Sequence, residues 1–316
     1  MAKSILPRLV IFGDPKKQRV AEAIDEFKAF AKDKAEIVAS CSIKDYKADI
    51  LKKSDYGKGL RLDECDFAIV FGGDGSIISA GRNLRKSKVP VIGINLGKLG
   101  FLAEFSVDEL KRYFDDIIRG KASIEKRMML SCKIFSSPNA TLRSSTSLRS
   151  TSQNRVKFSS VAINDVFITA GPLHRMIELK VAVNGQPVAS FVGDGLIIST
   201  PTGSTAYNLS ASGPILDSSM EAMVITPICP HSLSFRPIVI DANSKVEILR
   251  VQLDEGTTIS IDGQDSFKLT GNDIIKIERE NGDFLVVNNP LRTRWDTLAA
   301  KLGWAEKPKY KRDTIA

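Results

Sequence analysis

The sequence contains no long apolar run. No segment of its 316 residues approaches the roughly eighteen consecutive apolar residues that a membrane-spanning helix requires, so we expect no membrane partner. The amino end, from Met1 to Val10, has no extended apolar region and continues into an expected strand. We therefore expect no secretory signal and a cytoplasmic protein. The apolar content of 43% and the charged content of 26% are typical of a globular protein long enough for two domains.

Cysteine and histidine are scarce. The four cysteines lie far apart and match neither a zinc pattern nor a disulfide framework (Cys41, Cys65, Cys132 and Cys229). We expect them to be buried free thiols in a reducing compartment. The two histidines, His174 and His231, are not spaced to bind a metal together. We interpret His231 as structural, with contact to a bound phosphate as the alternative. The sequence thus predicts no metal site built from protein side chains.

Aromatic residues make up only 7% of the chain. The low aromatic content bears on nucleic-acid binding. The formal net charge is +8, and a basic protein is a candidate for binding nucleic acid. No basic patch is interleaved with aromatic residues, and part of the excess charge lies in the tail between Lys307 and Arg312. We therefore expect no nucleic-acid partner. A small polyanionic substrate would use some of the same charge.

Two common nucleotide-binding motifs are also missing. The segment from Gly93 to Lys98 is shorter than a Walker phosphate loop and lacks the Ser or Thr that follows the lysine. The turn after the first expected strand lacks the Gly-x-Gly-x-x-Gly fingerprint of dinucleotide-binding dehydrogenases. These absences argue against P-loop enzymes and against hydride transfer.

Strands and helices alternate in the first part of the chain. Apolar runs predict strands at 8–12, 36–40, 66–71 and 89–95, and helical spacing predicts helices at 16–32, from about 77, and at 106–119. Ser106 and Glu109 form a capping box, and Gly120 ends that helix. Such alternation implies a parallel sheet with helices on both faces. We expect residues 1–121 to form a Rossmann-like parallel α/β domain.

The rest of the chain is dominated by strands with short turns. The expected strands cover residues 124–135, 156–169, 177–183, 191–199, 238–240, 245–251, 257–261 and 273–278. This pattern predicts a β-sandwich-like domain over 122–290, so the fold class is α/β plus all-β. The segment Ser136 to Asn154, rich in Ser, Thr and Arg, is expected to be a mobile surface loop. Residues 291–316 are expected to pack back on the α/β domain, through a short helix closed by Gly303.

A glycine loop directly follows the apolar run that ends at Phe71. Its sequence is Gly72-Gly73-Asp74-Gly75-Ser76, at a strand-to-helix turn where glycines and free helix N–H groups suit a phosphate. Asp74 is unusual there, because a carboxylate repels phosphate. Three interpretations remain open: it holds a magnesium ion, it takes a proton from an attacking hydroxyl, or it caps the helix.

A second polar stretch follows the expected strand that ends at Ser199. It runs from Thr200 to Ser210 and is rich in Ser and Thr, with one glycine and Tyr207. Small donors and free N–H groups suit a phosphate or a ribose, and the tyrosine offers a flat face to a base. The alternative is a Ser/Thr turn with a helix cap. Such a string costs stability if it is buried without partners.

With these stretches the chain resembles the NAD kinase family, whose members phosphorylate the 2′-hydroxyl of the adenosine ribose of NAD. The resemblance covers nearly the whole chain, and the Ser136–Asn154 segment is the main departure. The glycine loop alone is shared with lipid kinases of the diacylglycerol type and with phosphofructokinases. The motifs that match are Gly72 to Gly75, Leu99 to Leu102, Asn164-Asp165, Thr200 to Tyr207, Pro230 to Ser234 and Asp262 to Gln264.

The resemblance implies roles for individual residues. Asp74 would act as the general base on the ribose hydroxyl, Asn164 and Asp165 would hold ribose hydroxyls or the adenine edge, and Arg175 would reach a phosphate. The implied NAD-binding residues are Gly75, Phe101, Asn164, Asp165, Arg175, Asp194, Thr205, Ala206, Tyr207, Asn208, Leu209, Ser210 and Gln264.

The resemblance also implies cofactors and partners. We expect NAD and ATP as substrates, Mg²⁺ or another divalent cation with the ATP, and assembly as a homo-oligomer, a dimer or a tetramer. Polyphosphate remains open as an alternative donor. Two other functions are weighed against this one: a non-catalytic dinucleotide-binding sensor, and a lipid kinase of the diacylglycerol type. The Asp74 carboxylate argues against the sensor, and the Thr200–Ser210 stretch has no use in a lipid kinase.

Overall fold

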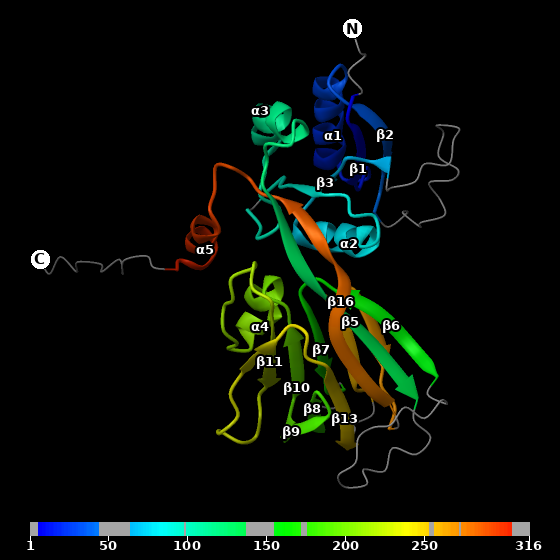
Figure 1. Cartoon of the computed structure of the whole chain (residues 1–316), viewed down its shortest axis with the longest axis vertical. Coiled ribbons are helices and arrows are strands. Elements are labelled where there is room, and N and C mark those ends of the chain that lie inside the picture. The colour runs from blue at the N-terminus through cyan, green and yellow to red at the C-terminus, as the bar shows by residue number, and fades with distance from the viewer. Residues whose placement is uncertain are drawn as a thin grey trace, which may run out of the picture. The chain divides into compact units, whose positions relative to one another are not determined.

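The computed structural model describes residues 6–43, 64–97, 99–136, 155–171, 176–252, 256–271 and 273–304. The chain divides into two compact units (Figure 1). The first comprises Met1–Ala80, Val89–Glu125 and Val286–Ala316, and the second comprises Gly81–Lys88 and Lys126–Leu285. Within the Ser136–Asn154 segment, whose expected mobility stays a prediction, residues 137–154 lie outside the described residues.

The first unit is built on a parallel sheet. Its strands are ordered β2 (Glu36–Cys41), β1 (Arg8–Gly13), β3 (Phe67–Phe71) and β4 (Val91–Ile94), and the end of β16 (Asp273–Val287) pairs in parallel with β4. Every residue of β3 is buried, as expected for a parallel strand covered on both faces. This is the parallel α/β architecture that the alternating pattern predicts.

Helices α1 (Gln18–Ala31) and α3 (Val107–Ile118) belong to the core of this unit. Their contact includes an edge-to-face pair of Phe27 and Phe114, whose ring centroids are 5.5 Å apart. The capping box of Ser106 and Glu109 is confirmed at the start of α3. Helix α2 (Asp74–Leu84) follows β3 directly.

The carboxyl-terminal helix α5 (Arg294–Leu302) ends as the sequence predicts. Gly303 has a φ of 63°, the left-handed conformation that glycine adopts without steric cost at a helix end. A second capping box at its start, between Thr293 and Asp296, is a feature that we did not predict from the sequence.

The second unit contains two largely antiparallel sheets. One has the order β12 (Ile238–Asp241), β11 (Ala222–Ile228), β10 (Gly195–Ser199), β7 (Asp165–Thr169), β14 (Thr258–Ile261) and β15 (Asp265–Lys268). The other continues from β16 through β13 (Val246–Gln252) and β8 (Ile177–Val183) to β9 (Gln186–Gly193), with β5 (Ile124–Ser136) and β6 (Val156–Ala162) beside it.

One apolar core joins the two sheets of this unit. It includes Ile198 of β10 and Ile259 of β14 from one sheet, and Ile248 of β13 and Ile275 of β16 from the other. Apolar residues alternate along several of these strands, which is the period that a half-buried strand requires. The predicted fold class, an α/β part with a β-sandwich-like part, is confirmed.

The cysteine prediction is wrong in part. All four cysteines are free, and Cys65 and Cys132 are buried, but Cys41 is half-buried and Cys229 is exposed. Cys229 follows β11 at a turn, with a φ of 43°, so its side chain stands at a corner of the sheet rather than in the core.

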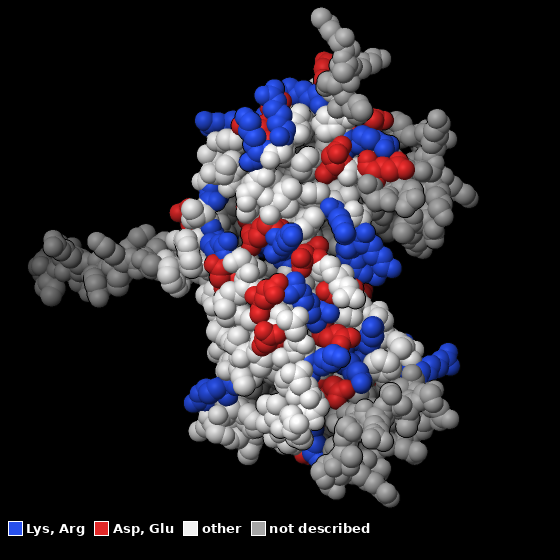
Figure 2. Space-filling model, in the orientation of Figure 1, with Lys and Arg blue, Asp and Glu red and all other residues white. Residues whose placement is uncertain are grey.

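Charges of both signs are interspersed over the face of the molecule drawn in Figure 2. Among the described residues, no helix is long and apolar enough to cross a membrane.

Candidate active site

Three strand ends of the second unit converge at one edge of its sheet. In the antiparallel register, Ser199 at the end of β10 lies opposite Asp165 at the start of β7. On the other side of β7, Ile261 at the end of β14 lies opposite Val166. The pairing therefore brings the Thr200–Ser210 stretch, the Asn164-Asp165 pair and Asp262 together, although they are far apart in sequence.

The Asn164 turn, which we define as Ile163-Asn164-Asp165, is bonded directly to the Thr200–Ser210 stretch. The N–H of Thr200 donates to the Asn164 carbonyl at 2.8 Å, and the Thr200 hydroxyl donates to the Ile163 carbonyl at 2.6 Å. A Cβ at Gly203 would lie 2.1 Å from the Asn164 carbonyl oxygen, so only glycine permits this approach. Asn164 is half-buried, and its side-chain amide has no hydrogen-bond partner among the described residues. That amide is available to a ligand.

The predicted NAD-binding residues between Thr205 and Ser210 differ in exposure. Tyr207 and Ser210 are exposed, while Thr205, Ala206 and Leu209 are half-buried. The Tyr207 ring meets Phe167 edge-on, with centroids 4.9 Å apart, which leaves a ring face for a base to stack on.

Asn208, in contrast, is fully buried. Its amide nitrogen donates to the carbonyls of Ser204 and Pro214 at 3.1 and 3.0 Å, and its amide oxygen accepts the Thr226 hydroxyl at 2.6 Å. These bonds fix the short helix α4 (Tyr207–Ser210). They also mean that the Asn208 amide bonds to protein groups rather than to a ligand.

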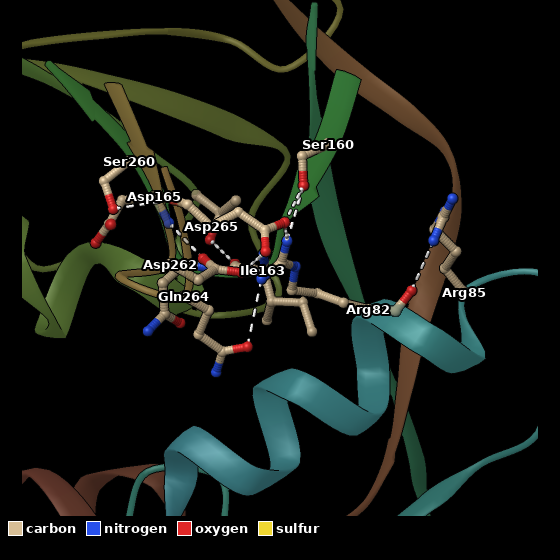
Figure 3. A network of polar contacts seen from close by, with 11 residues as sticks. Arg82, Arg85, Ser160, Ile163, Asp165, Ser260, Asp262, Gln264 and Asp265 are labelled. Atoms are coloured by element: carbon tan, nitrogen blue, oxygen red, sulfur yellow. Dashed lines mark hydrogen bonds and ion pairs between the residues drawn. The ribbon is translucent and has the colours of Figure 1, made fainter. Parts of the chain in front are cut away.

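The side chains of Asp165 and Asp262 are both buried, and the two residues are neighbours in one network of polar contacts (Figure 3). Burial, and to a smaller extent the neighbouring Asp262, raise the pKa of Asp165 to about 7, against the opposing effect of the backbone N–H of Tyr207. Burial also raises the pKa of Asp262, against the lowering effect of three backbone N–H groups and of Arg82. Asp165 therefore has a pKa near neutral, because burial disfavours its charged form and the neighbouring Asp262 adds to the effect.

Arg82 is a member of this group that we did not predict. Its guanidinium donates to Ser160 Oγ at 2.7 Å, to Gln264 Oε1 at 3.3 Å and to Asp265. Arg82 lies near the end of α2. The sequence around it contains no pattern that distinguishes it from a solvent-exposed arginine. Gln264, a predicted NAD-binding residue, is exposed and lies against this guanidinium.

The Asp74 loop, defined as residues 72–76 together with 99–103, forms a separate group in the first unit. Asp74 is the first residue of α2, and its carboxylate accepts three backbone N–H groups. Phe101 donates to Oδ2 at 2.8 Å, and Leu102 and Ala103 donate to Oδ1 at 3.0 Å. A carboxylate has about four acceptor positions, so with respect to the described residues Oδ2 retains one for a substrate hydroxyl.

The glycines of this loop leave its backbone open. A Cβ at Gly73 or at Gly75 would have no atom within 4 Å, so the fold itself does not require glycine at either position. Glycine there instead allows a ligand to approach the amino end of α2, where the helix dipole favours an anion. Phe101 is half-buried, and the ammonium of Lys301 lies 5.5 Å from its ring centroid.

Three other predicted residues lie apart from these groups or outside the structure. Asp194 is exposed, and its carboxylate hydrogen-bonds the thiol of Cys229, which raises the pKa of that thiol. His231 is exposed, and its backbone N–H donates to the Val192 carbonyl at 2.9 Å. Arg175 lies outside the described residues.

The donor set suits a metal ion that arrives with a nucleotide. Within the described ranges, no three His, Cys, Asp or Glu side chains cluster closely enough to hold a metal. Magnesium usually binds proteins through one or two carboxylates together with substrate phosphates. The one acceptor position left on the Asp74 carboxylate is retained for a substrate hydroxyl, so the open glycine backbone of the Asp74 loop fits the phosphates of a nucleotide that carries Mg²⁺ rather than a resident ion.

Comparisons with known proteins show which family the chain resembles. Residues 17–122 match the family model described as the ATP-NAD kinase N-terminal domain, and residues 163–289 match the model described as the ATP-NAD kinase C-terminal domain. The chain is 37% identical over 279 residues to the NAD kinase of Magnetococcus marinus, covering 88% of this chain and 85% of that protein. It is 38% identical over 245 residues to the NAD kinase of Geobacter metallireducens, covering 78% and 81% of the two chains.

A solved structure extends the similarity to the fold. The crystal structure of yeast NADH kinase complexed with NADH matches with a TM-score of 0.78 at 25% identity, covering 98% of this chain and 91% of that one.

Proposed function

The chain belongs to the NAD kinase family, and from this premise we propose how its residues transfer the terminal phosphoryl group of ATP to the 2′-hydroxyl of the adenosine ribose of NAD. The observation that carries the proposal is the Asp74 carboxylate. It is held by three N–H groups beside an open glycine backbone. Enzymes gain much of their rate from such fixed orientation.

The Asn164 turn and the Thr200–Ser210 stretch bind the dinucleotide in this proposal. The Asn164 amide and the Asp165 carboxyl supply donors and acceptors for hydroxyl pairs or for a base edge. Tyr207 supplies a stacking face, and the small residues Thr205, Ala206 and Ser210 allow the ligand to approach the backbone. The family relationship supports the assignment, as does the partial or full exposure of Asn164, Tyr207 and Ser210; Asp165 is buried and is assigned from the family relationship. Gly75, Phe101, Arg175, Asp194, Leu209 and Gln264 remain proposed contacts, and Asn208 supports the site by fixing α4.

Asp74 receives the proton of the 2′-hydroxyl as the hydroxyl oxygen attacks the terminal phosphorus of ATP and the bond from that phosphorus to the leaving ADP oxygen breaks. A sugar hydroxyl is a weak acid, so the carboxylate assists only while the proton is leaving, and positioning supplies most of the acceleration. The acceptor position left on Oδ2 is the atom we assign to that proton. Mg²⁺ bound with ATP would neutralise charge on the transferred phosphoryl group. The amino end of α2 would contribute further positive potential.

The remaining properties of the enzyme are proposed from family resemblance alone. They are a cytoplasmic location, assembly as a dimer or tetramer, and polyphosphate as a possible alternative donor to ATP.

The experiment that tests the function is direct. Purified protein is incubated with NAD, ATP and Mg²⁺, and NADP is detected with an NADP-specific dehydrogenase. We expect NADP from the wild type and a loss of turnover by orders of magnitude in Asp74→Asn. Because an asparagine nitrogen cannot accept from the N–H groups of residues 101–103, thermal unfolding and NAD binding are measured on the same variant. Asp108→Asn, which removes an exposed carboxylate from the first turn of α3, is the matched control and should retain turnover.

The outcomes separate the candidate functions. Near-normal turnover in Asp74→Asn would remove Asp74 from the mechanism. A wild type that binds NAD but makes no NADP with ATP or with polyphosphate would favour a dinucleotide-binding sensor. Phosphorylation of a diacylglycerol without phosphorylation of NAD would favour the lipid kinase.

A further inference from the structure

The turn between β14 and β15 has an uncommon backbone. The N–H of Gln264 donates to the Ile261 carbonyl at 2.9 Å, and the two central residues, Asp262 and Gly263, have φ values of 52° and 64°. This is the pattern of a type I′ hairpin turn, which favours Asp or Asn followed by Gly. Asp is among the residues that adopt the left-handed conformation most readily, and the contacts of Asp262 stabilise the position further.

Those contacts tie the hairpin turn to the Asn164 turn. The Asp262 carboxylate accepts the N–H groups of Ile163, Asn164 and Asp165 at 2.9, 2.8 and 3.1 Å. In return, the N–H of Asp262 donates to the Asp165 carbonyl at 2.9 Å. The Asp262 side chain is 0% exposed. These four hydrogen bonds fix the backbone from which the Asn164 and Asp165 side chains extend.

Arg82 contacts the same hairpin turn at several points (Figure 3). Its guanidinium donates to Gln264 and Asp265, and its Nε lies 3.8 Å from Asp262 Oδ2. Nε makes no hydrogen bond, and the Arg82 side chain is only 12% exposed. Arg82 is thus a cation placed beside a buried carboxylate that already faces a second one, Asp165. A buried charge without a counter-charge is costly, and Arg82 lowers the pKa of Asp262, together with the three backbone N–H groups, against the rise caused by burial.

We propose that Arg82 is a positioning residue for NAD binding: it holds the Asp262 hairpin turn, and through it the Asn164 turn, in the arrangement that receives the dinucleotide. This inference rests on the proposed function of the Asn164 turn. Arg82 itself need not touch NAD. Loss of Arg82 removes the cation that lies 3.8 Å from the Asp262 carboxylate and the donors to Gln264 and Asp265, and the Asn164 backbone relaxes. Small misplacements of binding groups have large effects on affinity and rate.

The test compares Arg82→Met with Arg85→Met. Arg85 follows α2 directly, is exposed, and donates to the Arg82 carbonyl at 2.9 Å, so the control removes the same charge from the same helix end. The dissociation constant of NAD is measured by calorimetry without ATP, and KM for NAD, KM for ATP and kcat are measured in the NADP assay. For Arg82→Met we expect NAD affinity to fall at least about tenfold and KM for NAD to rise in parallel. KM for ATP and kcat should change much less.

A double-mutant cycle distinguishes this role from general support of the fold. The loss of NAD affinity in Arg82→Met should be much smaller when Asp262→Asn is already present, because both changes disable the same contact. Additive losses would overturn the proposal, as would an NAD affinity of Arg82→Met equal to that of Arg85→Met. If Arg82→Met fails to fold, Arg82→Lys keeps the charge without the forked donors. It should then show a smaller but measurable loss, and unchanged affinity would equally overturn the proposal.

The binding measurement also separates this proposal from the proposed function. A wild type that binds no NAD would contradict the proposed function. A wild type that binds NAD and makes NADP, with affinity unaffected by Arg82→Met, would contradict the role of Arg82 alone.

Discussion

Gly100 lies directly against the carboxylate of Asp74. A Cβ at Gly100 would stand 2.0 Å from Asp74 Oδ1 and 2.7 Å from Asp74 Cγ. Both distances are too short for a nonbonded contact of a Cβ atom. The absence of a side chain at residue 100 is therefore what allows the N–H groups of residues 101–103 to close around the carboxylate. The two motifs of the Asp74 loop depend on one another sterically.

Gly100→Ala should accordingly displace the Asp74 carboxylate without removing it. We expect kcat for NADP formation to fall about a hundredfold or more, because misplacement of a catalytic group by about 1 Å has effects of this size. The midpoint of thermal unfolding and the affinity for NAD should change little. Gly97→Ala is the matched control, since a Cβ there would have no atom within 4 Å. Equal turnover in the two variants would show that the position of the carboxylate is not critical.

Asp165 should make folding stability depend on pH. Its pKa is about 7 in the folded protein against an ordinary value of 3.8, so between these values the folded chain holds a proton that the unfolded chain has released. The free energy of unfolding contributed by Asp165 therefore falls as pH rises from 3.8 to about 7, and the penalty is complete above that range. Asp165→Asn carries no such charge. The difference in unfolding free energy, variant minus wild type, should rise by a few kcal/mol as pH increases across this range.

Urea unfolding of both proteins between about pH 5 and about pH 8 measures this difference. Titrating groups that do not interact with Asp165 cancel in it, and the difference includes the response of Asp262, whose charge raises the pKa of Asp165. A difference that does not change with pH would mean that Asp165 is already ionised in the folded protein at low pH.

Glu109 should stabilise the first unit through two kinds of partner. Its carboxylate accepts the Ser106 N–H at 2.8 Å and the Arg292 guanidinium at 2.5 and 3.1 Å, and the Glu109 side chain is 18% exposed. Burial alone would raise the pKa of Glu109, but the Ser106 N–H and Arg292 outweigh it, so the pKa is lowered. The stabilisation is therefore fully present above about pH 4.5 and is lost as pH falls through the lowered pKa.

We expect Glu109→Gln to reduce the free energy of unfolding by about 1–3 kcal/mol at neutral pH, measured by urea titration. Asp108→Asn in the same helical turn should change it by less than about 0.5 kcal/mol, because Asp108 is exposed. The difference in unfolding free energy between Glu109→Gln and Asp108→Asn should disappear in acid. Equal effects at neutral pH would indicate that only the helix dipole is involved.

Local sequence patterns predicted the features that depend on neighbouring residues. The buried run that becomes β3, the capping box at Ser106 and the left-handed end at Gly303 are determined within a few residues of chain, and all are confirmed. The corner position of Cys229 was not predicted, because its exposure depends on where a strand of the folded sheet ends.

By itself, then, the sequence determined the fold class and the two polar stretches that mark the family, since periodicity and glycine placement are local properties. Only the tertiary structure decided which groups meet. Asp262 and Asn164 are 98 residues apart and hydrogen-bond each other because β7 lies between β10 and β14 in an antiparallel sheet. The register of those strands is set by burial of their apolar faces against the opposite sheet, which no single segment encodes. The same pairing brings Arg82 into contact with the hairpin turn, and no local pattern could have shown that arginine to differ from an exposed one.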